Sequence, residues 1–162
     1  MSEPNKSVLF VCHYNICRSP IAEAVFLDLL QKHNLLDEWK VDSAGPCDCS
    51  VGSGPEERAV ETLKKNGITN YQHTAREVSL SDFREFDYIF GMDEDNVRHL
   101  KWLQERSGSA GARAKVDFLG SYDPNGCNTI IADPVDLEGM EPFDRVFKQC
   151  LRFCTAFLEQ NS

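Results

Sequence analysis

The strongest constraint on the fold is a continuous apolar run from Ser7 to Cys12. The run reads Ser-Val-Leu-Phe-Val-Cys and is rich in β-branched and aromatic side chains. A short, unbroken apolar segment of this kind is typical of a strand that is covered on both faces. From about Pro20 to His33 apolar residues recur at near-helical intervals, with Ser19 and Pro20 placed as an N-cap and a first helical residue. We therefore expect a buried strand that leads through a short loop into a helix.

The same alternation continues to the end of the chain. We expect strands at 39–44, 88–92 and 116–119, helices at 55–65, 93–106 and 143–159, and a short helical turn at 81–86. Residues 107–111 are expected to form a flexible connection. Strands that alternate with helices predict a parallel sheet with right-handed crossovers, in a doubly wound, three-layer α/β domain. Ligands of such sheets bind beyond the carboxyl ends of the strands, where the loop after Cys12 lies.

Length and composition indicate one ordinary globular domain. The chain has 162 residues, of which 41% are hydrophobic and 27% charged, so we expect a single domain over residues 1–162. The formal net charge is -9, and the lysines and arginines are scattered. This charge pattern argues against binding to nucleic acid or to anionic lipid. Phosphate could still bind, but only through a local arrangement of donors.

Cysteine usage and the N-terminal sequence indicate a reducing compartment. The chain has seven cysteines, and its start carries no basic region that leads into a long apolar run. We therefore expect a cytoplasmic protein with reduced thiols, neither secreted nor membrane-spanning. The pairs Cys47 and Cys49, and Cys150 and Cys154, lack a second pair or a histidine partner at zinc-like separation. No metal site is expected.

The loop between the first strand and the first helix carries Cys12 and Arg18 at a Cys-x5-Arg spacing. The backbone N–H groups of residues 13–18 can converge on one point beside the helix N-terminus, which favours an anion there. Arg18 can offer its planar fork to two phosphate oxygens. The same donors should lower the pKa of the Cys12 thiol below the roughly 8.5 of a free cysteine, and Ser19 can add a hydrogen bond to the sulfur. The pattern predicts a phosphate-binding loop with a nucleophilic cysteine.

Asp133 is the candidate for the proton donor that such a reaction needs. A phenolate leaving group has a parent pKa near 10, so a general acid must be aimed at its oxygen. Asp133 lies in an irregular segment before the last helix, and Pro134 restricts the backbone that precedes it. The other Asp-Pro pair, Asp123 and Pro124, lies in an ordinary turn-forming sequence and is interpreted as structural. For the loop itself, a core cysteine with a surface arginine is the competing interpretation, because Cys-x5-Arg alone has only moderate specificity.

At these residues the sequence resembles the low-molecular-weight protein tyrosine phosphatases, from about Val8 to Glu159. The shared segments are Cys-x-x-Asn-Ile-Cys-Arg-Ser-Pro-Ile-Ala-Glu-Ala from 12, Asp-Ser-Ala at 42–44, His73 with Ala-Arg at 75–76, Phe-Asp-Tyr at 86–88, Met-Asp-Glu at 92–94, Gly-Ser-Tyr-Asp-Pro at 120–124 and Ala-Phe-Leu-Glu at 156–159. The resemblance implies a four-stranded parallel sheet flanked by helices, with the phosphotyrosine phosphatase I-like, flavodoxin-like topology. It also implies metal-free hydrolysis through a cysteinyl-phosphate, without a cofactor. The expected partners are a phosphotyrosine protein or a small aryl phosphate, with no nucleic acid and no membrane, and we expect a monomer or at most a weak dimer.

The resemblance also implies roles for single residues. Cys12 would be the nucleophile, Arg18 the phosphate binder and Asp133 the proton donor, in agreement with the chemistry of these side chains. The implied phosphate-binding loop comprises His13, Tyr14, Asn15, Ile16, Cys17 and Arg18. The implied supporting network, which would hold Asn15 in a left-handed conformation, comprises Asn15, Ser19, Ser43 and His73. Cys17 is similar to the family's redox partner, which traps an oxidised nucleophile as a reversible disulfide.

Three departures from the family pattern fall where the substrate would bind. The loop carries His13 and Tyr14 where the family usually has Leu-Gly. Cys49 stands where an aromatic residue usually walls the slot for the ring, and Val135-Asp136-Leu137 replaces an adjacent pair of tyrosines. Lost stacking costs about 0.5–1.5 kcal/mol per wall. We therefore expect an atypical pocket with walls at Tyr14, Cys49, Val135 and Asp136, in which Tyr14 replaces a lost wall and Asp136 disfavours acidic peptides.

Two alternative functions stay open beside a tyrosine phosphatase with acid-phosphatase-like activity on aryl phosphates. The first is a weakly active or inactive phosphate- or phosphoprotein-binding module of the same fold. Joint retention of Cys12, Arg18, Ser19 and Asp133 argues against it, because a pure binder needs neither thiolate nor acid. The second is an arsenate reductase of similar fold, which needs further cysteines to relay a disulfide. Residues 80–95 contain no cysteine.

Overall fold

The computed structural model describes residues 3–108, 113–127 and 129–161, which form a four-stranded parallel sheet flanked by helices. The strands lie in the order β2-β1-β3-β4, and each neighbouring pair is parallel. They are β1 (Lys6–Val11), β2 (Trp39–Ala44), β3 (Tyr88–Gly91) and β4 (Lys115–Phe118). The helices are α1 (Arg18–Lys32), α2 (Glu57–Lys65), α3 (Asp82–Glu85), α4 (Glu94–Arg106) and α5 (Glu141–Gln160), with 3-10 turns η1 (Leu36–Glu38) and η2 (Leu119–Tyr122). The predicted α/β fold is confirmed.

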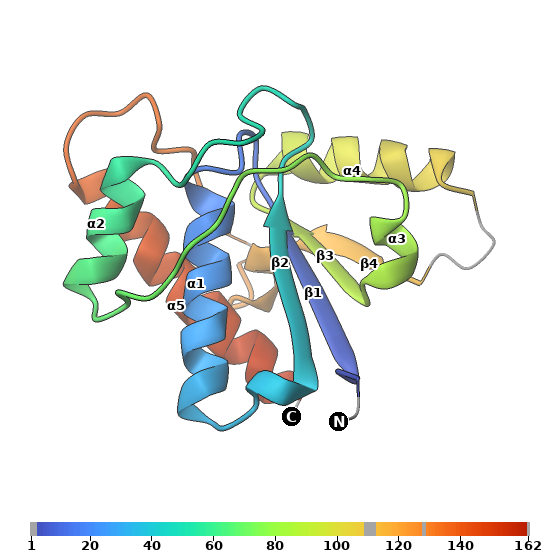
Figure 1. The fold of residues 1–162 in the computed structure, drawn as a ribbon, viewed down its shortest axis with the longest axis horizontal. Helices are drawn as coiled ribbons and strands as arrows, with labels where there is room; N and C mark the ends of the chain where they lie inside the picture. The colour runs from blue at the N-terminus through green and yellow to red at the C-terminus, as the bar shows by residue number, and fades with distance from the viewer. Residues whose placement is uncertain (1–2, 109–112, 128, 162) are drawn as a thin grey trace.

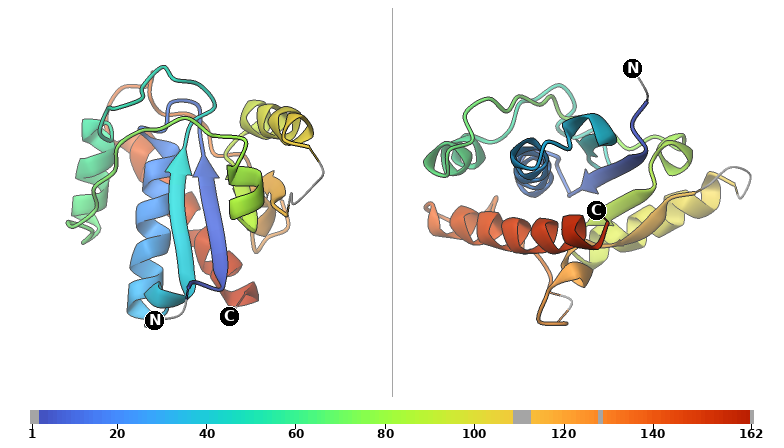
Figure 2. Two further views of the ribbon diagram at one scale, coloured as in Figure 1. Left: turned by 45° about the vertical axis from the view of Figure 1, so that its right-hand side comes forward. Right: turned by 90° about the horizontal axis from the view of Figure 1, so that it is seen from below.

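Helices cover both faces of the sheet (Figure 1 and Figure 2). On one face α1 and α5 pack together, with α2 against both of them, and on the other face lie α3 and α4. The central strand β1 explains this layering, because its alternate side chains enter different cores. Val8 and Phe10 belong to the core with α1 and α5, whereas Leu9 and Val11 belong to the core with α3 and α4. All four side chains are fully buried, which accounts for the unbroken apolar run.

The strand order reverses at β1, and this reversal positions the loop that follows it. The chain places β2 on one side of β1 and then crosses to place β3 on the other side. Cys12 directly follows β1, and Asp93 follows β3 by two residues. The carboxyl ends of adjacent parallel strands meet at one edge of the sheet, so these two loops lie together at the usual ligand-binding position of the fold.

The start of α1 differs from the prediction. The helix begins at Arg18 with Cys17 as N-cap, and no side chain caps it. Ser19 is therefore inside the first turn, and its prediction as N-cap is wrong. The loop already turns into helical geometry at Arg18, so the Ser19 hydroxyl is free to face the loop instead of the helix end. Pro20 remains in the first turn, where its missing N–H has no intrahelical partner to lose.

Three further expectations concern membrane-spanning helices, the state of the cysteines and the connection at 107–111. No helix in the described ranges is long and apolar enough to cross a membrane. All seven cysteines are free thiols. Residues 109–111, within the expected flexible connection, lie outside the described residues.

Candidate active site

Cys12 and Ser19 form the centre of the candidate site, at the end of β1 and the start of α1. The Cys12 sulfur lies 3.0 Å from the Ser19 hydroxyl oxygen. Both side chains are almost completely buried, with 2% of Cys12 and none of Ser19 exposed. The predicted contact between the hydroxyl and the sulfur is thus present. In this arrangement the hydroxyl can donate a hydrogen bond to a thiolate, which stabilises the charged form.

Arg18 lies beside Cys12 and is held from three directions. Its Nη1 donates to Asp93 Oδ2 at 2.6 Å and to the carbonyl oxygen of Ile131 at 2.9 Å. Its Nη2 lies 3.5 Å from Asp133 Oδ2. Among the described residues the guanidinium Nε is the one buried side-chain nitrogen or oxygen without a hydrogen-bond partner. A buried donor without an acceptor is costly, so Nε marks the place where an anion would complete the site.

Asp133 faces the site from the irregular segment before α5. Its Oδ2 is the atom that approaches Arg18, and its Oδ1 accepts a hydrogen bond from the Val135 N–H at 3.2 Å. The Asp133 side chain is 30% exposed. A carboxyl in this position can reach both the buried phosphate site and solvent, as a proton donor must.

Asn15 organises the loop through four side-chain contacts. Its backbone has φ +57°, the left-handed conformation that the family resemblance implied. Its amide nitrogen donates to Ser19 Oγ at 2.9 Å and to Ser43 Oγ at 3.0 Å. Its amide oxygen lies 2.8 Å from His73 Nε2 and accepts from the Arg76 N–H at 3.1 Å. The structure therefore brings together the four residues expected to support the loop.

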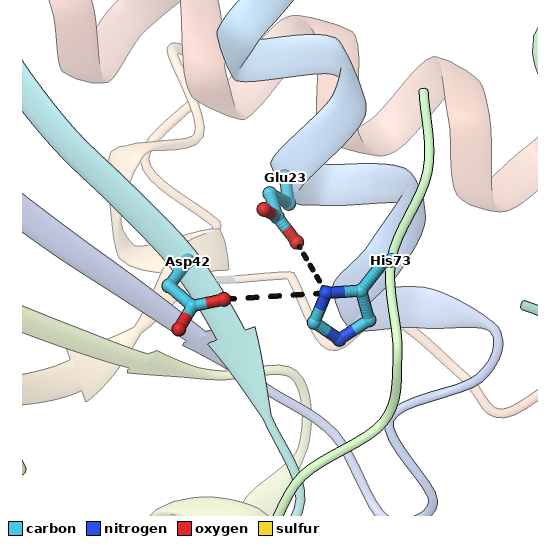
Figure 3. Close-up of side chains that lie close together, drawn as sticks. All are labelled: Glu23, Asp42 and His73. Carbon is cyan, nitrogen blue, oxygen red and sulfur yellow. Dashed lines mark ion pairs between the residues drawn. The ribbon is translucent and has the colours of Figure 1, made fainter. Parts of the chain in front are cut away.

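Behind Asn15, His73 lies between two carboxylates (Figure 3). Its Nδ1 is 3.4 Å from Glu23 Oε1, on α1, and 4.0 Å from Asp42 Oδ1, on β2. Glu23 Oε1 also accepts hydrogen bonds from Ser43 Oγ at 2.6 Å and from the Tyr71 hydroxyl at 2.7 Å. Burial raises the pKa of Glu23 to about 7, although both hydroxyl donors oppose the rise. Burial lowers the pKa of His73, with Asp42 acting in the opposite direction.

These three side chains are the group in the described ranges whose ligand atoms lie close enough to hold a metal ion. Each of them already has a protein partner. The Arg76 guanidinium binds Asp42 at 2.9 Å, the two hydroxyls bind Glu23, and Asn15 binds His73. A cation bound by this group would have to displace the Arg76 guanidinium from Asp42. The chemistry of the cluster therefore fits a hydrogen-bonded support for the loop.

His13 and Tyr14 lie beside the segment that follows β2, where Cys47 Sγ is 3.9 Å from the His13 carbonyl oxygen. The rings of His13 and Tyr14 contact each other edge-to-face, with centroids 4.2 Å apart. A cavity of about 350 Å³ beside His13 contains neither the catalytic candidates nor any of the four predicted walls in its lining, which comprises His13, Pro46, Cys47, Asp95, Asn96 and His99. Cys49 and Asp136 are exposed. Val135 packs partly against the main core, so its side chain is shared between that core and the predicted wall.

Cys17 has surroundings that disfavour its thiolate. Only 3% of the residue is exposed. Burial raises the pKa of its thiol, and the charges of Cys12, Glu56 and Asp133 raise it further. A thiol must ionise to attack an oxidised partner. Formation of a disulfide between Cys12 and Cys17 stays a prediction, and these surroundings would slow it.

The other Asp-Pro pair, Asp123 and Pro124, has the structural role predicted for it. Asp123 Oδ1 accepts from the Asn125 N–H at 3.0 Å, and its Oδ2 accepts from Thr129 Oγ1 at 2.6 Å. These bonds close the turn that follows η2, away from Cys12. Asp133 is thus the Asp-Pro aspartate that contacts Arg18.

Sequence reasoning assigned no role to Asp93, although its side chain contacts Arg18. Asp93 Oδ1 caps α4 by accepting from the Asn96 N–H at 2.9 Å, while its Oδ2 pairs with Arg18. The cap is visible in the sequence as an aspartate before a helical pattern. The pairing with Arg18 is not visible, because 75 residues separate the two.

Comparison with known proteins gives one family. A family model described as low molecular weight phosphotyrosine protein phosphatase matches residues 7–161. The low molecular weight phosphotyrosine protein phosphatase of Sus scrofa is 48% identical over 157 residues, which are 96% of this chain and 95% of the relative. The low molecular weight phosphotyrosine protein phosphatase 1 of Drosophila melanogaster is 42% identical over 155 residues, 96% of each protein.

Solved structures give the same result. The crystal structure of DARP, drosophila arginine phosphatase, has a TM-score of 0.87 and 41% identity, over 96% of this chain and 97% of that one. The crystal structure of Primo-1 has a TM-score of 0.84 and 41% identity, with the same coverage.

Proposed function

Because this chain belongs to the low molecular weight phosphotyrosine protein phosphatases and is therefore a hydrolase, we propose that Cys12, Arg18 and Asp133 carry out its reaction. The observation that carries the proposal is the position of Arg18. Its guanidinium lies between the loop and Asp133, with Nε buried and without a partner. An anion that satisfies Nε would bring phosphorus close to Cys12 and the leaving oxygen toward Asp133.

The first chemical step transfers the phosphoryl group to the protein. The Cys12 thiolate attacks phosphorus, a sulfur–phosphorus bond forms and the bond to the phenolic oxygen breaks. Asp133 gives its proton to that oxygen, so the leaving group departs as a neutral phenol. Arg18 holds two of the remaining phosphate oxygens and stabilises their charge in the transition state.

The second step hydrolyses the cysteinyl-phosphate. The Asp133 carboxylate, now ionised, takes a proton from a water molecule that attacks phosphorus. The sulfur–phosphorus bond breaks, Cys12 leaves as a thiolate and inorganic phosphate is released. The Ser19 hydroxyl, 3.0 Å from the sulfur, stabilises this leaving thiolate. Each step conserves protons, and none of them requires a metal or a cofactor.

We assign a phosphotyrosine protein or a small aryl phosphate as substrate, bound in an entrance that differs from the family pattern. Tyr14, Cys49, Val135 and Asp136 are the proposed walls, and exposed Asp136 favours substrates without acidic flanks. We further propose a single phosphatase domain that acts as a monomer in the cytoplasm. The odd number of cysteines, seven in a chain large enough to fold without disulfides, supports a reducing compartment.

The test compares hydrolysis of an aryl phosphate by the unchanged protein and by two variants. Cys12→Ser should abolish turnover, and Asp133→Asn should lower kcat/KM for phenyl phosphate by about 10²–10⁴. Phosphoarginine serves as a second substrate, because one of the similar structures is an arginine phosphatase. An unchanged protein that is no faster than Cys12→Ser on both substrates would contradict the proposed reaction and favour the binding-module alternative.

A further inference from the structure

The segment that carries Asp133 has no regular secondary structure between residues 129 and 138 apart from turns. Before Asp133 the segment is tied to the site, because Arg18 Nη1 binds the Ile131 carbonyl oxygen at 2.9 Å, and Arg18 Nη2 lies 3.5 Å from Asp133 itself. After Asp133 the local bonds stay within the segment. The Val135 N–H binds Asp133 Oδ1, and the Leu137 N–H binds the Pro134 carbonyl oxygen at 3.1 Å. Precise proton donation also requires the segment to be fixed relative to the phosphate-binding loop.

Arg58, in the first turn of α2, connects the part of this segment after Asp133 to α2. Its Nη2 donates to the Val135 carbonyl oxygen at 3.0 Å, and its Nη1 donates to the carbonyl oxygens of Leu137 at 2.5 Å and Gly139 at 3.4 Å. Figure 1 shows α2 beside the orange segment that leads into α5. Val135 therefore binds Asp133 through its N–H and Arg58 through its carbonyl group.

Arg58 is itself held in place by two neighbours. Its Nε lies 3.2 Å from both carboxylate oxygens of Glu56. Its guanidinium lies over the ring of Phe143, 4.4 Å from the centroid, and Phe143 is fully buried at the start of α5. A planar fork with five donors in fixed directions suits this position, whereas the ammonium group of a lysine presents its three donors from one nitrogen atom.

The contacts of Arg58 and Glu56 also lead to the phosphate-binding loop. The Glu56 N–H donates to the carbonyl oxygen of Ile16 at 2.8 Å. A continuous series of contacts therefore runs from Ile16 through Glu56 and Arg58 to Val135 and Asp133. Its two ends are the loop that would bind phosphate and the group that would donate the proton.

We propose that Arg58 is a positioning residue for Asp133, and that it aligns the proton donor with the phosphate-binding loop by holding the 135–139 carbonyl groups. The inference rests on the proposed role of Asp133. It gives Arg58 no contact with substrate. Arg58 acts through the segment, so its effect is confined to the two steps that use Asp133. Of these, kcat/KM reports the first, in which the leaving group is protonated.

The test measures kcat/KM for two substrates that differ in leaving group. Phenyl phosphate has a leaving group whose phenol has a pKa near 10, so the departing oxygen needs a proton from the general acid. The leaving group of 4-nitrophenyl phosphate comes from a more acidic phenol and needs that proton much less. Arg58→Met should lower kcat/KM for phenyl phosphate about tenfold, a part of the 10²–10⁴ that a general acid supplies. It should lower kcat/KM for 4-nitrophenyl phosphate less than about twofold. Arg145→Met, an exposed arginine near the start of α5, is the matched control for charge and should change neither value.

A merely structural role for Arg58 predicts a different result. Loss of folded protein would lower both rates equally and would appear in a thermal unfolding curve. An equal decrease for both substrates, or no decrease, overturns the inference. If Arg58→Met does not fold, Arg58→Lys gives the same comparison, because it keeps the charge and the aliphatic stem.

A double variant separates this inference from the proposed function. If Arg58 acts through Asp133, Arg58→Met should cause almost no further decrease in kcat/KM when Asp133 is already Asn. Independent, multiplicative effects contradict the inference. If Asp133→Asn itself shows no dependence on the leaving group, the assignment of the proton donor is wrong, and Arg58 has no donor to position.

Discussion

Replacement of Glu23 by glutamine should change how the stability of the protein depends on pH. Glu23 is only 7% exposed, and burial raises its pKa to about 7. Its Oε1 accepts hydrogen bonds from Ser43 and Tyr71. Glutamine has nearly the shape of a protonated glutamic acid, and its amide oxygen can accept the same two bonds. Glu23→Gln therefore mimics the protonated state at every pH.

The magnitude follows from the difference between the folded and unfolded pKa values. The ordinary value is 4.5 and the folded value is about 7. Between these values the folded state binds the proton more tightly, so the unfolding free energy of the unchanged protein falls as pH rises. At about 1.4 kcal/mol per pKa unit, the full loss above pH 7 is about 3 kcal/mol. The glutamine variant has no such loss.

His73 acts in the opposite direction over part of this range. Its folded pKa is lowered from 6.5, so its contribution to stability increases as pH rises and is complete above the unfolded value. Below pH 6.5 the two groups partly cancel. Between pH 6.5 and about 7 the Glu23 contribution acts alone, and above that range its loss is complete.

Urea unfolding at pH 5 and at pH 8 measures the effect. The difference in unfolding free energy between Glu23→Gln and the unchanged protein should shift by about 2.5 kcal/mol in favour of the variant from pH 5 to pH 8, because a small part of the full loss has already occurred at pH 5. Glu61→Gln, at an exposed position on α2, is the control and should show no such shift. A difference that does not depend on pH, or that shifts in favour of the unchanged protein, would refute the burial argument.

Three other substitutions, one of them with a control substitution, test single contacts. Asp93→Ala removes the 2.6 Å partner of buried Arg18 and the cap of α4, so it should lower the unfolding free energy by about 3–5 kcal/mol. Inorganic phosphate should recover part of this loss. The same difference in unfolding free energy with and without phosphate would contradict the expectation. Gly120→Ala should destabilise by about 3 kcal/mol or more, because the new Cβ would lie 1.7 Å from the Thr129 carbonyl oxygen. Gly54→Ala, with open space around it, should stay within about 0.5 kcal/mol in the same unfolding measurement. Tyr14→Leu should raise KM for aryl phosphates more than for small alkyl phosphates, and equal effects would show that Tyr14 is not a wall of the slot.

The sequence predicts those parts of the fold and site that depend on local order. The unbroken apolar run before Cys12, and the helical periodicity after it, identify β1 and α1 because each pattern lies within one element. Cys12, Arg18 and Ser19 come together for the same reason, since one loop carries all three. The local Ser-Pro signal nevertheless misplaces the start of α1, because a serine before a proline resembles an N-cap even when its hydroxyl faces a cysteine at 3.0 Å.

Contacts between distant segments could not be predicted in this way. Arg58 reaches residues 77 to 81 positions away, and no periodicity marks an arginine that binds main-chain carbonyl groups. Glu23 looks like an ordinary charge on a helix in the sequence. It is buried because β2 and the segment around Tyr71 cover that face of α1 with hydroxyl donors. Such positions become visible only when the packing of the elements is known.

The contact between Arg18 and Asp133 also bears on the protonation of the carboxyl proposed as proton donor. Asp133 Oδ2 lies 3.5 Å from Arg18 Nη2, so the positive charge helps to hold the carboxyl beside the loop. A phosphate dianion bound at Arg18 competes for the same guanidinium and repels an ionised Asp133. That repulsion favours the protonated carboxyl, which is the form that the first step requires. It also removes one of the two restraints on Asp133 and leaves the Val135 N–H as the other. The Arg58 contacts that hold Val135 therefore matter most at the moment when substrate is bound.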